Sequence, residues 1–242
     1  MIIYGMNPLL ERIKQGGRGI SEIIVATGRK GAAVDNILSW ASEKGIPVTC
    51  KDKSYLDHVS GGSAHQGIAA FCAAYAYVNI DELIANSTQA NLILMLDGIT
   101  DPHNLGALIR TAHCLGVKGV IIPADRAAAV TATVIKASAG AAHWLPVTRE
   151  VNLTRTIDYL KEKGFWIYGA DADQGTDLNQ FADAGPVCLV MGSEGSGIRP
   201  LIKKKCDFLL SIPMVGKLHS LNVSVAAGII MYEMARKQGR KN

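Results

Sequence analysis

The chain has 242 residues, of which 48% are hydrophobic and 25 are glycines, and its formal net charge is +4. This apolar content excludes a disordered chain, and the weak positive charge permits nucleic-acid binding without requiring it. The five cysteines are widely spaced and include no CxxC pair, so we expect neither a disulfide framework nor a metal site. The longest apolar run, residues 68–78, is shorter than the roughly 18 residues of a membrane span, and the amino terminus shows no export signal. We therefore expect a cytoplasmic protein without a membrane segment.

The first part of the chain alternates short apolar runs with amphipathic stretches. Predicted strands lie at residues 21–26, 46–49 and 67–73, and predicted helices at residues 32–44 and 52–59. Asn7 followed by Pro8 predicts an earlier helix start with the asparagine as N-cap. The alternation is typical of a small α/β unit.

The second part repeats the alternation over a greater length. Predicted strands lie at residues 92–98, 117–122, 144–147, 165–170, 187–191 and 208–212, and predicted helices at residues 104–115, 131–139, 152–163 and 221–238. Such alternation indicates an α/β fold with a mostly parallel sheet covered on both faces. We expect an amino-terminal domain at residues 1–76, a linker at 77–90 and a second domain at 91–242.

Three strands of the second domain run directly into polar or glycine-rich segments, where open α/β sheets bind their ligands. The first segment is DGITDPHNLGALIRTA, residues 97–112. Asn104 can cap the helix that follows, and Gly106 allows a ligand to approach its first turn. Arg110 lies four residues after Gly106, on the same side of a helix. The alternative is a capped helix that carries a surface arginine.

The second segment, VCLVMGSEGSGI at residues 187–198, has its glycines in the spacing GxxGxG. The chain contains neither the GxGxxG dinucleotide fingerprint nor a GxxxxGK[ST] loop, which disfavours a nicotinamide enzyme and an NTPase. Glu194 stands among the glycines where a turn would favour Asn or Asp, so a functional role competes with that of an ordinary loop. In the third segment, residues 209–235, Ser220 and Asn222 can either cap a helix or present polar atoms to a ligand.

The stretches NLGALIRTA, LVMGSEGSGI and SIPMVGKLHSLNVSVAAGI resemble three ordered motifs of the SpoU (TrmH) family within the SPOUT superfamily. These are RNA ribose 2'-O-methyltransferases that use S-adenosylmethionine. IIYGMNPLLERI and HQGIAA resemble the family's amino-terminal substrate-binding domain, which is related to kink-turn-binding ribosomal proteins. The resemblance covers nearly the whole chain and is closest to members that methylate a guanosine ribose in 23S rRNA. It implies a Rossmann-like parallel sheet whose carboxyl-terminal part forms a deep trefoil knot.

The resemblance also assigns site residues. Those implied to hold S-adenosylmethionine are Met191, Gly192, Ile212 and Leu221. Those implied to be catalytic are Asn104, Arg110, Glu194, Ser220 and Asn222. Because an arginine is effectively never deprotonated in proteins, we expect Arg110 to grip a phosphate and stabilise the developing alkoxide, with Asn104 orienting it. Glu194 would orient Arg110 or receive the proton, and Ser220 and Asn222 would hold the ribose or the knotted loop.

The expected partner is 23S rRNA or a ribosome assembly intermediate. Arg18, Arg29 and Lys30 lie in glycine-containing loops and could bind RNA phosphates, although ordinary solvated loop charges are an equal alternative. The resemblance further implies a homodimer packed through the knotted domain. Two alternatives stay open: a 2'-O-methyltransferase acting on tRNA or on another rRNA nucleotide, and a non-catalytic RNA-binding protein of ribosome assembly.

Overall fold

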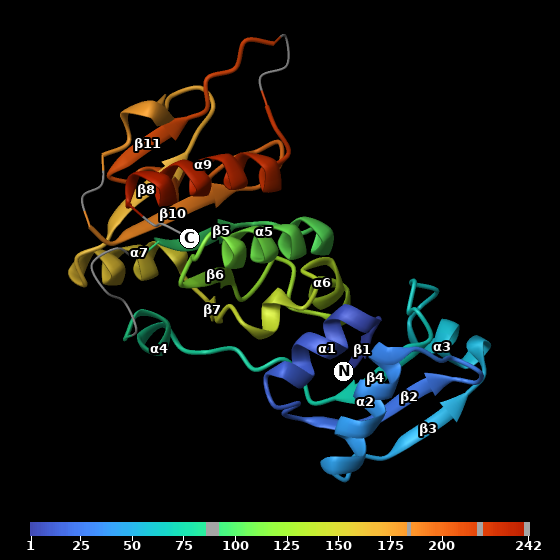
Figure 1. Ribbon diagram of the computed structural model, residues 1–242. Helices are drawn as coiled ribbons and strands as arrows, with labels where there is room; N and C mark the ends of the chain where they lie inside the picture. Colours follow the sequence, from blue (N-terminus) through green and yellow to red (C-terminus); the bar gives the residue numbers. More distant parts are fainter. Residues whose placement is uncertain (86–91, 183–184, 217–219, 240–242) are drawn as a thin grey trace. The chain divides into compact units, whose positions relative to one another are not determined.

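The computed structural model describes residues 1–85, 92–182, 185–216 and 220–239 (Figure 1). The chain divides into two compact units. Unit 1 comprises residues 1–76 and 130–144, and unit 2 comprises residues 77–129 and 145–242. Within the predicted linker, helix α4 (Ile80–Ala85) belongs to unit 2, and residues 86–90 fall outside the described part of the chain.

Unit 1 contains a four-stranded mixed sheet in the order β1-β4-β2-β3. Its strands are β1 (Ile2–Tyr4), β2 (Ile20–Ala26), β3 (Val48–Lys51) and β4 (Ile68–Cys72). Its helices are α1 (Met6–Lys14), α2 (Ala32–Glu43), α3 (Lys53–Val59), α6 (Ala132–Ala137) and the 3-10 turn η1 (Ala141–His143). Because β2 and β3 are parallel, their carboxyl ends lie at the same edge of the sheet.

The start of α1 depends on a residue far away in the sequence. The helix begins at Met6, after Gly5, whose φ of +97° favours glycine. The backbone N–H of Met6 donates to Gln66 Oε1 at 2.8 Å, so a loop before β4 supplies the polar atom for this helix end. The prediction of Asn7 as N-cap is therefore wrong.

Residues 130–144 complete unit 1, although they interrupt the sequence of unit 2. Ala132 packs against the small core that contains Tyr4. Gly140 has a φ of +89°, and a Cβ added there would lie 2.7 Å from the Cβ of Glu11. Trp144 Nε1 donates to Glu11 Oε2 at 2.8 Å. The predicted strand at 144–147 is thus wrong in both bounds: Trp144 still belongs to this segment, and the strand runs from Val147 to Glu150.

His143 is a buried base in unit 1 whose protonation should oppose folding. Burial, together with the Arg12 guanidinium 3.4 Å from Nδ1, lowers the pKa of His143 from 6.5 to about 4. Between these two values the unfolded chain binds the proton and the folded chain does not, so stability rises with pH. Lowering the pH from about 7.5 to 5 should therefore cost roughly 2 kcal/mol at this residue.

This pH dependence is measured by urea unfolding at both pH values. In His143→Gln, which cannot take up the proton, the loss of stability on acidification should shrink by that amount. The matched control is His113→Gln, at an exposed histidine, which should keep the full loss. The same loss in His143→Gln as in the unmodified protein would contradict the expectation.

Unit 2 contains a seven-stranded sheet in the order β7-β6-β5-β10-β8-β11-β9. Its strands are β5 (Leu92–Asp97), β6 (Gly119–Pro123), β7 (Val147–Glu150), β8 (Trp166–Ala170), β9 (Thr176–Asp177), β10 (Val187–Gly192) and β11 (Phe208–Ser211). Besides α4, its helices are α5 (Pro102–Cys114), α7 (Leu153–Glu162), α8 (Pro200–Lys203), α9 (Val223–Lys237) and the 3-10 turn η2 (Leu178–Gln180). All of these strand pairings are parallel, which confirms the predicted α/β class.

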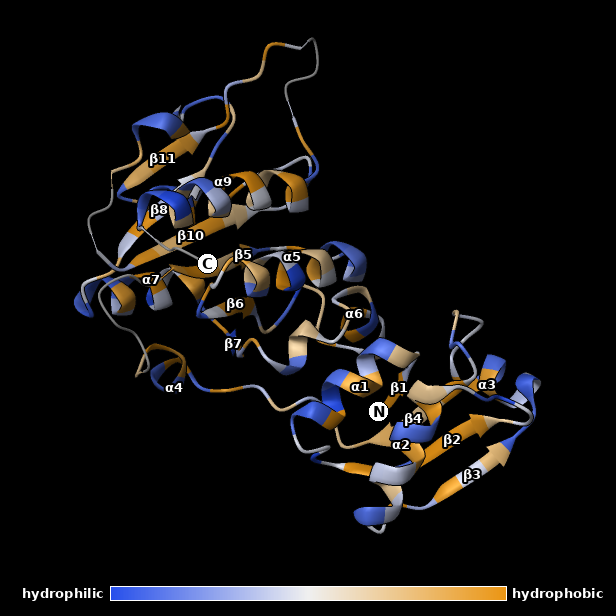
Figure 2. Ribbon diagram, viewed as in Figure 1, coloured by the Kyte–Doolittle hydropathy of each residue, from blue (hydrophilic) through white to orange (hydrophobic). Residues whose placement is uncertain are grey.

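The two central strands of unit 2, β5 and β10, are buried along their whole length and coloured hydrophobic in Figure 2. Alternate side chains of these strands point to opposite faces of the sheet. On one face, Met95 and Val190 belong to a core that also takes Ile157 of α7 and Ile202 of α8. On the other face, α5 and α9 pack side by side (Figure 1). No helix in the described part of the chain is long and apolar enough to span a bilayer.

Candidate active site

The strand order of unit 2 reverses between β5 and β10, and open α/β sheets bind ligands at this point. Gly192, the last residue of β10, pairs with Asp97, the last residue of β5. The first two polar segments predicted from the sequence therefore leave the sheet side by side. The third follows β11, two strands further along.

A cavity of about 530 Å³ opens beside the carboxyl ends of β8, β10 and β11. Its wall includes all four residues implied to hold the cofactor, Met191, Gly192, Ile212 and Leu221, together with Glu194 and Ser220. The volume falls within the usual range for small-molecule sites. The lining residues include apolar ones such as Leu210, Ile212 and Ile230 and the glycine-rich loop, a mixture that suits a nucleoside with a polar tail. The residues present therefore fit S-adenosylmethionine.

The glycine-rich loop at the mouth of this cavity is a tight turn. The N–H of Ser193 donates to the oxygen of Gly197 at 3.1 Å, and the N–H of Gly197 returns to the oxygen of Ser193 at 3.0 Å. Gly195 adopts a φ of +87° in the turn. A Cβ on Gly192 would lie only 2.0 Å from the carbonyl carbon of Gly197, so this position has no space for any side chain. The turn holds Glu194 at its exposed tip.

Three of the predicted catalytic side chains meet in one hydrogen-bonded group, which we call the amide–carboxylate cluster: Asn104, Glu194 and Asn222. Glu194 Oε1 accepts from Asn104 Nδ2 at 3.2 Å and from Asn222 Nδ2 at 2.5 Å. Asn222 Nδ2 also donates to Asn104 Oδ1 at 3.0 Å. The cluster joins α5, the glycine-rich loop and the start of α9, which are up to 118 residues apart in sequence. Glu194 belongs both to this cluster and to the cavity wall.

The helix starts around the cluster differ from the prediction at α5. Asp101 is the N-cap of α5, accepting from the N–H groups of His103 and Asn104, so the prediction of Asn104 as cap is wrong. Because Asp101 caps the helix, the side chain of Asn104 is free to enter the cluster. Asn222 is the N-cap of α9, its Oδ1 accepting from the N–H of Ser224 at 2.9 Å. Asn222 therefore fixes the start of α9 through Oδ1 and holds Glu194 through Nδ2.

Arg110 and Ser220 stand outside the cluster. Arg110 is exposed on α5, and its guanidinium forms no hydrogen bond or ion pair with any residue that the structure describes. The expected orienting contacts from Asn104 and Glu194 are thus not formed within one chain. Gly106, four residues earlier on α5, is buried, whereas Arg110 is exposed. Ser220 is exposed and lines the cavity.

Asp171 and Lys203 place opposite charges on the cavity wall. Lys203 Nζ lies 2.5 Å from Asp171 Oδ2. Burial by itself would raise the pKa of Asp171, but hydrogen bonds from Lys203 and from the N–H groups of Gln174 and Asp173 outweigh it and lower the pKa. The wall therefore keeps a carboxylate at neutral pH. Across the described residues, no group of His, Cys, Asp or Glu could hold a metal ion.

An ion pair between Asp97 and Arg199, which the sequence did not predict, lies beside the site. The Asp97 side chain is fully buried at the end of β5, and Arg199 follows the glycine-rich loop. Asp97 accepts from the backbone N–H of Arg199 at 2.8 Å, from Nε at 2.6 Å and from Nη2 at 2.6 Å. The pair thus anchors the loop that carries Glu194 to the strand that leads into α5. In the sequence, this ion pair is indicated only by a charged residue, Asp97, at the end of an apolar strand.

The two members of this pair should differ in their effect on stability. Arg199→Ala leaves a buried carboxylate without its cation and should cost about 3–5 kcal/mol of unfolding free energy. Asp97→Asn removes charge-assisted hydrogen bonds but leaves Arg199, whose side chain is 58% exposed, in contact with water. This variant should lose about 1–3 kcal/mol of unfolding free energy. Urea unfolding of both variants and of the double variant measures this order, with the double variant more stable than Arg199→Ala. Equal losses in the two single variants would contradict it.

The predicted RNA-binding residues of unit 1 lie at two different places. Arg29 and Lys30 lie in the loop between β2 and α2. Arg18 precedes β2, so the length of this seven-residue strand, roughly 20 Å, separates it from the other two. The structure thus brings Arg29 and Lys30 together and leaves Arg18 at the opposite edge of the sheet.

Comparison with known proteins agrees with this arrangement. Residues 91–232 match the sequence model of the SpoU rRNA Methylase family, and residues 2–78 match that of RNA 2'-O ribose methyltransferase substrate binding. A putative TrmH family tRNA/rRNA methyltransferase from Staphylococcus haemolyticus is 44% identical, over 98% of this chain and 96% of that protein. One from Staphylococcus saprophyticus is 43% identical over the same shares. The chain belongs to the SpoU rRNA methylase family and is an RNA methyltransferase.

Solved structures share the fold. The SpoU methyltransferase AviRb from Streptomyces viridochromogenes superposes with a TM-score of 0.84 at 22% identity, covering 98% of this chain and 89% of that one. AviRb has also been solved in complex with the cofactor AdoMet, S-adenosylmethionine. A putative RNA methyltransferase of the TrmH family from Porphyromonas gingivalis gives 0.75 at 25% identity, with coverage of 98% and 89%. Family membership implies the trefoil knot expected for the carboxyl-terminal part of unit 2.

Proposed function

We propose that the protein transfers a methyl group from S-adenosylmethionine to the ribose 2'-hydroxyl of a guanosine in 23S rRNA. One observation carries the proposal: Glu194 lines the cavity that suits the methyl donor and is held by Asn104 and Asn222 at its mouth. A nucleotide bound against this loop would meet the donor and a carboxylate together. Family membership and the match to a substrate-binding model in unit 1 support RNA as the acceptor.

S-adenosylmethionine supplies an electrophilic methyl group; transfer forms the O–CH3 bond, breaks the S–CH3 bond and requires loss of the hydroxyl proton. In this proposal Glu194 receives the proton directly or through a water. Arg110 stays protonated, grips the adjacent phosphate and stabilises the developing alkoxide. Asn222 holds the glycine-rich loop through Nδ2, which donates to Glu194, while its Oδ1 caps α9. Ser220, exposed at the cavity, binds the ribose.

The proposal includes a homodimer packed through α9. Val225, Ile229 and Tyr232 recur at helical spacing and are 51%, 40% and 61% exposed. They continue from Leu221 on the cavity wall, so a second copy seated on this face would adjoin the site. Since Arg110 has no contact with the cluster of its own chain, the proposed dimer provides the place where this arginine meets a cluster and substrate.

The test compares 2'-O-methylated nucleosides in rRNA and tRNA from cells with and without the protein. Loss of one 2'-O-methylguanosine from 23S rRNA is expected. Loss from tRNA, or from another rRNA nucleotide, would support the alternative substrates instead. Calorimetric titration with S-adenosylmethionine separates the enzyme from a non-catalytic assembly protein, since the enzyme must bind this compound. For location, the proposal places the protein in the cytoplasm with its ribosomal substrate.

A further inference from the structure

Four basic residues gather at one edge of the unit 1 sheet, where β2 and β3 end. The parallel register pairs Ala26 with Lys51, and the N–H of Thr27 donates to the oxygen of Lys51 at 2.8 Å. This pairing joins the loop after β2 to the turn between β3 and α3. We call the group the basic edge: Arg29, Lys30, Lys51 and Lys53.

The charges of the basic edge are not neutralised within the fold. All four side chains are exposed, and none forms an ion pair or a side-chain hydrogen bond with a described residue. In unit 2, by contrast, Lys161, Lys203 and Lys205 each pair with a carboxylate. Lys51 Nζ lies 5.5 Å from the centre of the Tyr55 ring, a contact that leaves its charge in place. Cations without ion pairs, grouped at one edge, create a local positive potential that attracts a polyanion.

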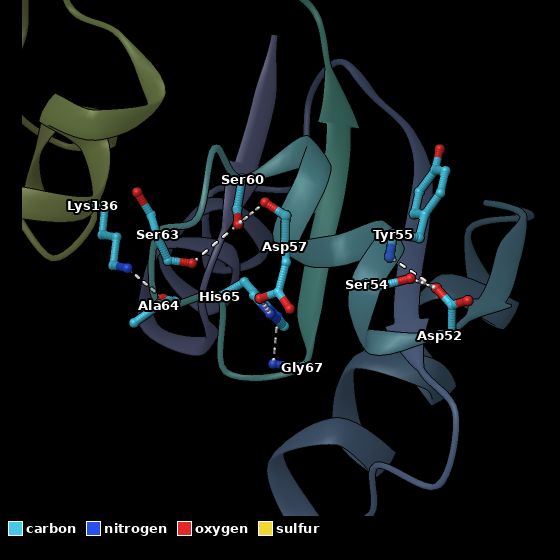
Figure 3. A network of polar contacts seen from close by, with 10 residues as sticks. All are labelled: Asp52, Ser54, Tyr55, Asp57, Ser60, Ser63, Ala64, His65, Gly67 and Lys136. Carbon is cyan, nitrogen blue, oxygen red and sulfur yellow. Dashed lines mark hydrogen bonds and ion pairs between the residues drawn. The ribbon is translucent and has the colours of Figure 1, made fainter.

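The nearest carboxylates in the sequence accept hydrogen bonds but keep their negative charge, and hydrogen bonds from Tyr55 and Ser54, together with the charge of Lys51, lower the pKa of Asp52. Asp52 is the N-cap of α3 and accepts from the N–H of Tyr55 at 2.8 Å and from Ser54. Asp57 accepts from His65 Nε2 at 2.9 Å (Figure 3). Asp35, in the first turn of α2, is the remaining exposed carboxylate in these segments. Four cations in these segments therefore stand against three carboxylates, Asp35, Asp52 and Asp57, which leaves a small excess of positive charge.

The loop that supports Arg29 is fixed by hydrogen bonds. His65 is buried with both ring nitrogens occupied, because Nδ1 accepts from the N–H of Gly67 at 3.0 Å. This excludes a catalytic Asp–His pair and gives His65 a structural role. Lys136 donates to the carbonyl oxygen of Ala64 in the same loop (Figure 3). A Cβ on Gly67 would lie 3.0 Å from Arg29 Cδ, so the arginine stem rests on this loop. The edge is a preformed surface.

We propose that the basic edge binds the sugar–phosphate backbone of the RNA substrate, with Lys51 and Lys53 as contacts that the sequence did not indicate. This inference rests on the proposed function and locates its RNA contact in unit 1. A protein partner is disfavoured, because the one large hydrophobic side chain exposed in the described part of unit 1, apart from Trp144, is Val48 at the other end of β3. Ammonium and guanidinium groups bind phosphates without reading sequence.

The experiment compares two double variants of the full chain that carry the same net charge. Lys51→Gln/Lys53→Gln removes two cations from the basic edge. Lys14→Gln/Lys44→Gln removes two exposed cations from the opposite end of the same sheet. The probe is a fluorescently labelled RNA hairpin with an unpaired loop, titrated at several salt concentrations. Glutamine keeps most of each stem, and thermal unfolding checks that both variants are folded.

The edge variant should bind the hairpin about tenfold more weakly near 0.1 M salt, and the slope of log affinity against log salt should fall by about 1–2. The opposite-end variant should bind as the unmodified protein does. Equal affinities for the two variants, or a loss confined to the opposite-end variant, would overturn the inference. If the unmodified protein bound no RNA at low salt, the proposed function itself would fail. If the unmodified protein methylated RNA and the edge variant bound RNA with unchanged affinity, only the role of the basic edge would be refuted.

Discussion

Arg110→Ala is expected to reduce methyl transfer at least about 100-fold, because it removes the cation that stabilises the developing alkoxide. Binding of S-adenosylmethionine should be unchanged, since Arg110 does not line the cavity. Stability should also be unchanged, because this exposed side chain forms no hydrogen bond or ion pair with a described residue. Single-turnover methylation of RNA and calorimetric titration with S-adenosylmethionine measure the two effects separately.

Two further variants sharpen this result. Arg155→Ala removes another exposed arginine of unit 2 whose guanidinium forms no hydrogen bond or ion pair with a described residue, and it should keep full activity. Arg110→Lys keeps the charge but loses the planar fork, so partial activity is expected. If Arg110→Ala bound S-adenosylmethionine more weakly but transferred the methyl group at the normal rate once the cofactor was bound, the role assigned to this arginine would be wrong.

Gly192→Ala should abolish binding of S-adenosylmethionine. The added methyl group would lie 2.0 Å from the carbonyl carbon of Gly197 and 2.2 Å from the nitrogen of Ile198. Since both contacts are backbone, the whole glycine-rich turn must move, and the cavity wall moves with it. Calorimetric titration should show at least a 100-fold weaker affinity, about 3 kcal/mol.

The matched control is Gly228→Ala on α9. There the new Cβ would lie 3.5 Å from Thr111 Cγ2, an ordinary contact, and cofactor binding should persist. Thermal unfolding of both variants shows how far the loss of binding reflects local movement of the turn. Normal cofactor affinity in Gly192→Ala would show that this cavity does not hold the methyl donor.

The sequence predicts the sheet of unit 2 well, because its central strands are buried on both faces and leave continuous apolar runs. The same logic brings the three polar segments to one region, since parallel strands end at one edge. Sequence patterns do not predict contacts between residues that are distant in the chain. Asp97 and Arg199 are 102 residues apart, and Met6 and Gln66, which bond at the start of α1, are 60 residues apart. No local pattern marks such pairs.

Local signals also mislead where two residues can do the same task. Asp101 and Asn104 are both good N-caps, and the structure uses Asp101, which leaves Asn104 for Glu194. The sequence of residues 130–144 indicates a helix but not the unit to which it belongs. Their packing onto α1 depends on Gly140 and Glu11, which are far apart along the chain.

The inserted segment at residues 130–144 also affects how the protein folds during synthesis. Unit 1 cannot be completed when residue 76 leaves the ribosome, because α6 and η1 are still unsynthesised. A fragment ending at residue 76 would expose the surface that these elements cover, so it is a poor substitute for unit 1 in isolation. Strands β5 and β6 and helices α4 and α5 of unit 2 must emerge in between, and the two units therefore mature together rather than one after the other.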